Sequence, residues 1–143
     1  MEKSSILSKL KEIASIVWPV LLIGLGGRIE VPFGNVPFIL SDFFVFLFAL
    51  QFSGWRSLSY ISLFLLLGTL GVPLFAGGAS GIEVWSSPTA GYLLGYLVGA
   101  LFIVLVKKTY PSPLLLLLYT FIAYYLLFVC GLAILYFHLD KDL

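Results

Sequence analysis

Long apolar runs with very few charges are the feature of this sequence that most restricts its fold. Only 10 % of the 143 residues are charged and 61 % are hydrophobic, whereas a soluble domain carries about 25 % charged residues. A helix needs roughly 20 apolar residues to cross the hydrocarbon core of a membrane, and fewer where it is short or bent. Several runs here are long enough, which predicts an all-α integral membrane protein.

We expect one domain over residues 1–143, a polytopic bundle of about five transmembrane helices. Their predicted ranges are 13–27, 38–52, 57–72, 88–106 and 114–137. Residues 1–12 read as an amphipathic lead at the inner membrane interface, with Ile6, Leu7 and Leu10 on one side and lysines on the other. No small-residue cleavage site follows the first apolar run, so we expect a retained lead rather than a signal peptide.

The basic residues predict the orientation of the bundle. With a cytoplasmic amino terminus, the inner segments hold Lys3, Lys9, Lys11, Arg56, Lys107 and Lys108, and the outer segments hold Arg28 and Lys141. This excess on the inside agrees with the positive-inside rule. Two Gly- and Pro-rich loops, residues 28–37 and 73–87, then face the outside together. We therefore expect a multi-pass protein of the cell membrane, surrounded by lipid.

Catalysis and metal binding find little support in the sequence. His138 is the sole histidine and Cys130 the sole cysteine, so zinc-type spacing is absent. The sequence has no Walker motif for ATP and no cluster of carboxylates, and its net charge is +1. We expect no enzyme, no catalytic residue, no metal site, no cofactor or ATP site, and no nucleic-acid partner.

The stretch from Gly68 to Gly99 carries the strongest sign of a binding site. Its loop lacks the charge of a spacer and contains Gly77 and Gly78, whose backbone can approach a ligand closely. Ser87 suits an N-cap and Pro88 the first helical position, so residues 89–91 would present free N–H groups. Such groups suit a carboxylate or another polar ligand group. An ordinary capped helix explains the same residues equally well.

Three further features are open to two explanations each. Glycines recur every fourth residue from Gly91 to Gly99, which favours close helix packing over ligand contact. Tyr92 could equally line a cavity or pack between helices. Asp42 is the acidic residue expected within a span, and so a functional candidate, although a helix-dipole or interface role fits as well. A fourth feature, Arg28, could pair with Glu30 or with lipid headgroups, and it is also a cation within reach of a bound anion.

Two segments of the chain resemble a family signature. The sequence contains Val72-Pro73-Leu74-Phe75-Ala76-Gly77-Gly78, followed after seven residues by Ser86-Ser87-Pro88-Thr89-Ala90-Gly91-Tyr92-Leu93. This pattern is similar to the GLPVFAGG…GPTGGYL signature of the BioY family, the biotin-specific S components of energy-coupling-factor transporters. Residues 29–38 resemble the first outer loop of that family, and the similarity extends over about residues 20–137.

The sequence departs from the family pattern at several positions. Ser87 and Ala90 replace glycines, and Ser41-Asp42 stand where a Gln-Thr pair is common. Family members have six helices, and the sixth carries an Asp and a Lys near the ligand. Asp140 and Lys141 supply these residue types here, outside the family's spacing. We expect either a truncated sequence or a protein that lacks the sixth helix.

The resemblance implies a membrane subunit that captures biotin from the outside and passes it inward together with a coupling module. Its partners would be a transmembrane coupling protein and ATPase subunits. The expected ligand-binding residues are Asn35, Phe75, Gly77, Gly78, Thr89, Gly91 and Tyr92, with Ser87, Arg28, Asp42, Asp140 and Lys141 as further candidates. The alternatives are an S component for another small vitamin and a structural membrane subunit that transports nothing.

Overall fold

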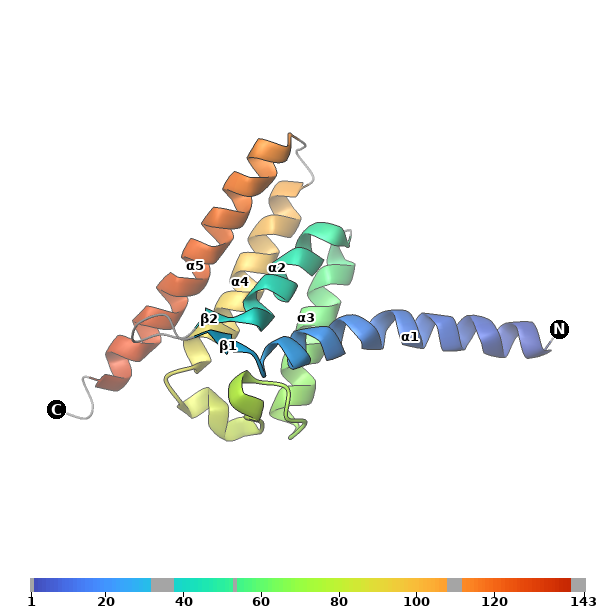
Figure 1. The fold of residues 1–143 in the computed structure, drawn as a ribbon, viewed down its shortest axis with the longest axis horizontal. Helices are drawn as coiled ribbons and strands as arrows, with labels where there is room; N and C mark the ends of the chain where they lie inside the picture. The colour runs from blue at the N-terminus through green and yellow to red at the C-terminus, as the bar shows by residue number, and fades with distance from the viewer. Residues whose placement is uncertain (1, 32–37, 53, 108–111, 140–143) are drawn as a thin grey trace.

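The fold was obtained as a computed structural model, which describes residues 2–31, 38–52, 54–107 and 112–139 (Figure 1). Five α-helices make up most of the described chain: α1 (Glu2–Gly26), α2 (Leu40–Gln51), α3 (Trp55–Thr69), α4 (Ala90–Lys107) and α5 (Pro113–Leu139). Two-residue strands, β1 (Glu30–Val31) and β2 (Phe38–Ile39), pair antiparallel. Two short 3₁₀ helices, η1 (Ala76–Gly78) and η2 (Ile82–Ser86), lie between α3 and α4. The predicted helical bundle is confirmed.

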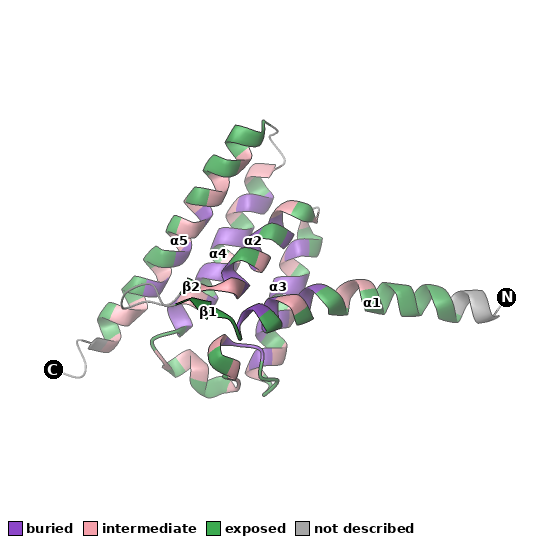
Figure 2. Cartoon of the chain, in the orientation of Figure 1, coloured by how far each residue is buried: buried purple, intermediate pink, exposed green. Residues whose placement is uncertain are grey.

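The first helix is longer than the sequence analysis predicts. The expected boundary between a lead over residues 1–12 and a helix over 13–27 is wrong, because α1 runs from Glu2 to Gly26 without interruption. No glycine or proline precedes Pro19, and Lys, Glu and Leu are good helix formers, so nothing ends the helix early. The first half of α1 extends away from the bundle, and its side chains from Ile6 onward are exposed (Figures 1 and 2).

Two of the described helices, α4 and α5, are long and apolar enough to cross a membrane. The 12 residues of α2 form a shorter apolar helix. These lengths and compositions agree with a membrane protein. Five crossings and a cytoplasmic amino terminus stay predictions.

The interior of the bundle receives large side chains from every helix. The most deeply buried are Ile23 of α1, Phe46 of α2, Ile61 and Phe64 of α3, Ile103 of α4 and Leu127 of α5. In Figure 2 the buried positions of α2, α3 and α4 face one another, whereas much of α5 is exposed. In a membrane, contact between helices depends on close van der Waals packing, since lipid is as apolar as the side chains.

Glycines allow α4 to lie directly against α5. A Cβ atom added at Gly91 would collide with the carbonyl oxygen of Cys130, and one at Gly95 would lie 2.8 Å from the Cα of Leu127. At Gly99 the added atom would meet the ring of Phe46 at 2.6 Å. The packing explanation of the glycine repeat is therefore confirmed.

The two Gly- and Pro-rich segments lie at the same end of the bundle, where β1, β2 and the η helices meet (Figure 1). A hydrogen bond of 2.9 Å connects the amide of Gly77 in the second segment to the carbonyl of Gly27, the residue just before the first segment. Of the segment predicted as an extended loop over residues 28–37, Glu30 and Val31 form β1, in which Glu30 pairs with Ile39 and Val31 with Phe38. This end of the molecule holds the candidate site.

Candidate functional site

A cavity of about 150 Å³ lies beneath the 73–87 loop, among α2, α3, α4 and α5. Apolar side chains form most of its wall: Ile39, Phe64, Phe75, Ala76, Ala79, Val84, Leu93 and Phe128. Polar side chains line the remainder: Ser41, Asp42, Thr89, Tyr92 and Tyr96. An apolar cavity with a few converging polar groups is the usual form of a small-molecule site.

Phe75 is held in the cavity wall by the residues beneath its ring. It is 2 % exposed, and its ring meets that of Phe64 edge-on, with 5.5 Å between centroids. The ring also lies over Gly68, where any Cβ atom would collide with it. A glycine at position 68 thus makes room for the aromatic wall of the site.

Gly77 and Gly78 shape the loop rather than line the cavity. Their φ angles are +63° and +84°, in the region that favours glycine. The amide of Gly78 donates to the carbonyl of Phe75 at 2.9 Å, and the amide of Gly77 donates to the carbonyl of Gly27 at the same distance. The expectation that these backbone groups meet a ligand is therefore not supported, because their donors are already used within the chain.

Arg28 lies over the same loop. Its Nη2 donates to the carbonyl of Pro73 at 3.3 Å, and a Cβ atom at Gly78 would lie 2.9 Å from its Cζ. The guanidinium is thus packed on the outside of the loop and is not among the residues that line the cavity.

The start of α4 differs from the prediction. The hydroxyl of Ser87 donates to the carbonyl of Val84 at 2.6 Å and accepts from the amide of Thr89 at 3.3 Å. The amide of Ala90 donates to the carbonyl of Ser87 at 3.1 Å. The prediction of free N–H groups is wrong for residues 89 and 90, because both amides donate hydrogen bonds to Ser87 in the turn before α4. Ser87 acts as a cap, and its side chain lies outside the cavity lining.

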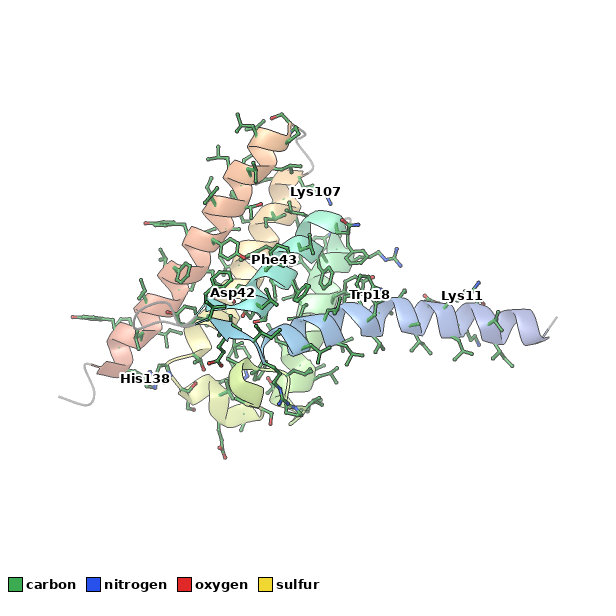
Figure 3. The ribbon with its side chains drawn as sticks, viewed as in Figure 1. Lys11, Trp18, Asp42, Phe43, Lys107 and His138 are labelled. Carbon is green, nitrogen blue, oxygen red and sulfur yellow. The ribbon has the colours of Figure 1, made fainter. Side chains whose placement is uncertain are left out.

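A buried polar cluster forms one end of the cavity. The hydroxyl of Tyr96 donates to Oδ1 of Asp42 at 2.6 Å and lies 2.9 Å from Oγ of Ser41. Ser41, Asp42 and Tyr96 are 3 %, 7 % and 4 % exposed. Figure 3 shows Asp42 in the middle of the molecule, at the start of α2. Asp42 is a site candidate from the sequence alone, whereas Ser41 and Tyr96 are not. The sequence offers one indication of a role for Tyr96: it follows Tyr92 by four residues, which places both on the same side of the predicted helix.

Tyr92 lines the cavity, which is one of its two predicted roles. Its ring packs against Gly131, where a Cβ atom would lie 2.5 Å from Cζ, and meets Phe128 edge-on at 6.2 Å. Its hydroxyl oxygen is buried and has no hydrogen-bond partner among the described residues. A buried polar group left unpaired costs about 1–3 kcal/mol. A polar ligand group in the cavity would remove that cost.

The structure brings together some of the predicted site residues and not others. Phe75, Thr89, Tyr92 and Asp42 line the cavity. Gly91 lies at the contact of α4 with α5 instead. Asn35, Asp140 and Lys141 lie outside the described residues. Within the described ranges no group of three or more His, Cys, Asp or Glu residues is placed to hold a metal ion.

Two apolar helices of membrane-spanning length agree with a helical membrane protein, and a small, mostly apolar cavity lies among its helices. This chain belongs to the BioY family, whose sequence model matches residues 1–143.

Relatives with known names agree with this assignment. The chain is 40 % identical over 91 residues to "Biotin transporter BioY" of Thermotoga maritima, covering 64 % of this chain and 54 % of that protein. It is 37 % identical over 91 residues to "Biotin transporter BioY2" of Lactococcus lactis subsp. cremoris, covering 64 % and 50 %. The chain thus spans about half the length of these relatives.

A solved structure supports the fold. The crystal structure of the S-component for biotin from an ECF-type ABC transporter superposes with a TM-score of 0.81, covering 93 % of this chain and 75 % of that one. The sequence identity is 21 %, so the likeness concerns the fold alone.

Proposed function

We propose that this chain is a biotin-binding membrane subunit for biotin uptake. The observation that carries the proposal is the cavity beneath the 73–87 loop, with its aromatic wall and its buried polar groups. Support comes from membership of the BioY family and from relatives named biotin transporters.

The chemistry of biotin suits this cavity. The molecule has a ureido ring with two N–H donors and one carbonyl acceptor, an apolar thioether ring, and a chain that ends in a carboxylate. Phe64, Phe75 and Phe128 offer contact to the apolar thioether ring. Asp42 and Tyr92 offer an acceptor and an unpaired hydroxyl to the ureido group. A site built to pair a ligand's polar groups rejects analogues that lack them, since its own groups are then left unpaired.

Uptake also requires partners and an orientation. We infer that the chain lies in the cell membrane as a multi-pass protein, captures biotin from the outside and works with a transmembrane coupling protein and ATPase subunits. The sequence has no ATP-binding motif of its own. The Gly- and Pro-rich segments lie together at one end of the bundle, which is consistent with an outward-facing entrance there. The basic residues Arg56 and Lys107 lie near the other end, which is consistent with that end facing the cytoplasm.

A titration tests the proposed function. The purified protein, shown to be folded by its circular dichroism and thermal transition, is titrated with biotin, thiamine and riboflavin in a calorimeter. We expect saturable binding of biotin and none of the other two. Saturable binding of thiamine or riboflavin alone would favour an S component for another vitamin. A folded protein that binds none of the three would contradict the proposal and favour a structural subunit.

A further inference from the structure

Asp42 is a buried acid with neutral partners. It is 7 % exposed, and Tyr96 supplies its side-chain hydrogen bond. Two basic side chains of the bundle bind backbone carbonyls elsewhere: Arg28 donates to the carbonyl of Pro73, and Lys107, at the other end of α2, donates to those of Leu50 and Phe52. No ion pair to Asp42 exists within the described residues. Ionisable groups in such surroundings are expensive and generally have a function.

The hydrogen bonds around Asp42 have a defined direction. Tyr96 has one hydroxyl hydrogen and gives it to Asp42, so Ser41 must donate in its 2.9 Å contact with Tyr96. The order is therefore Ser41 to Tyr96 to Asp42, and the carboxylate is the final acceptor. An ionised carboxylate can accept about four hydrogen bonds. Tyr96 and the backbone of Ile39 use part of this capacity. Because Asp42 also lines the cavity, the capacity that remains can accept hydrogen bonds from a ligand.

We propose that Asp42 is the residue that recognises the N–H groups of the ureido ring, with Tyr96 as the residue that positions its carboxylate. This inference rests on the proposed function. An acceptor that is surrounded by neutral donors selects a ligand group rich in N–H, whether a urea or a guanidinium. The same negative charge repels a carboxylate, so biotin enters this end of the cavity ring first and its carboxylate lies away from Asp42.

A pair of ligands distinguishes this role from a structural one. In 2-iminobiotin a guanidinium replaces the urea; it keeps the two ring N–H groups and adds a positive charge at neutral pH. A recognising carboxylate favours the charged ring, because hydrogen bonds between charged groups are stronger than those with a neutral partner. We expect the full chain in detergent to bind 2-iminobiotin at least as tightly as biotin. Much weaker binding of 2-iminobiotin to the unaltered protein would overturn the inference without any variant.

The variant Asp42→Asn provides the second measurement. It keeps the shape of the side chain and removes its charge. We expect the ratio of 2-iminobiotin affinity to biotin affinity to fall by roughly tenfold or more, as the loss of a charged hydrogen bond implies. Tyr96→Phe should lower the same ratio by a smaller factor. Glu83→Gln is the matched control, because it removes an exposed acid outside the cavity lining and should leave both affinities unchanged.

The outcomes separate the two proposals. If biotin binds and Asp42→Asn weakens both ligands equally, Asp42 is structural and the inference is wrong, while the proposed function stands. If the folded protein binds neither ligand, both fail. A fall in the ratio for Asp42→Asn but not for Glu83→Gln supports the inference.

Discussion

Tyr96 shows how a single hydroxyl supports a buried acid. Its hydroxyl group contacts Ser41 and Asp42, which lie 55 and 54 residues earlier in the sequence, and so joins the middle of α4 to the start of α2. We predict that Tyr96→Phe lowers the free energy of unfolding by about 1–3 kcal/mol, because Asp42 loses its side-chain donor. Thermal unfolding in detergent measures the effect. Tyr125→Phe is the control, since Tyr125 is 68 % exposed; equal effects of the two changes would contradict the role of Tyr96.

Gly68 provides a second test at the scale of one residue. We predict that Gly68→Ala destabilises the protein by about 1–3 kcal/mol, because the new methyl group collides with the ring of Phe75. It should also weaken biotin binding, since that ring is part of the cavity wall. Combining it with Phe75→Leu should cost less than the sum of the two single changes. If the losses of unfolding free energy from the two single changes simply add up in the double variant, measured by chemical or thermal unfolding, the contact between Gly68 and Phe75 is not supported.

Among the elements, α4 and α5 pack closely at glycine positions of α4. We predict that Gly95→Leu destabilises the protein by at least about 1–3 kcal/mol, because a Cβ atom there already lies 2.8 Å from the backbone of Leu127. Leu94→Phe is the control, since Leu94 is 42 % exposed. Comparable unfolding midpoints for the two variants would show that the helices can separate without cost.

The other end of α2 is held by a lysine of α4. The Nζ of Lys107 donates to the carbonyls of Leu50 and Phe52, where a positive charge also complements the helix dipole. We predict that Lys107→Met lowers stability by about 1 kcal/mol, up to about 2 kcal/mol in this half-buried setting. The control is Lys9→Met, because Lys9 is exposed on α1 and its replacement should leave the unfolding midpoint unchanged. Equal unfolding midpoints for Lys107→Met and Lys9→Met would refute the capping role of Lys107.

Sequence patterns predicted the helices well because long apolar runs separated by Gly and Pro are local signals. They predicted Phe75, Thr89 and Tyr92 in the cavity because these residues share a motif around one loop. They failed at the start of α4, where the turn uses its own amides. They also failed at the first boundary of α1, since no local break marks it.

At the scale of the whole molecule, the Asp42 and Tyr96 contact could not be predicted. It depends on the register of α2 against α4, which is determined by how side chains such as Phe46 pack at Gly99. That packing also brings Ile39, Phe64 and Phe128 into the cavity wall from three separate elements. Residues that meet only through helix packing leave no pattern in a single sequence.

Photoaffinity labelling tests the central claim most directly, because it locates the ligand. The folded protein is irradiated with a biotin derivative that carries a small photoreactive group on its carboxylate end, and labelled peptides are identified by mass spectrometry. We predict labelling of the 73–87 loop and the start of α4, suppressed by excess free biotin. Labelling confined to the exposed face of α5, around Phe121 and Tyr136, or labelling that excess biotin leaves unchanged, would contradict the account.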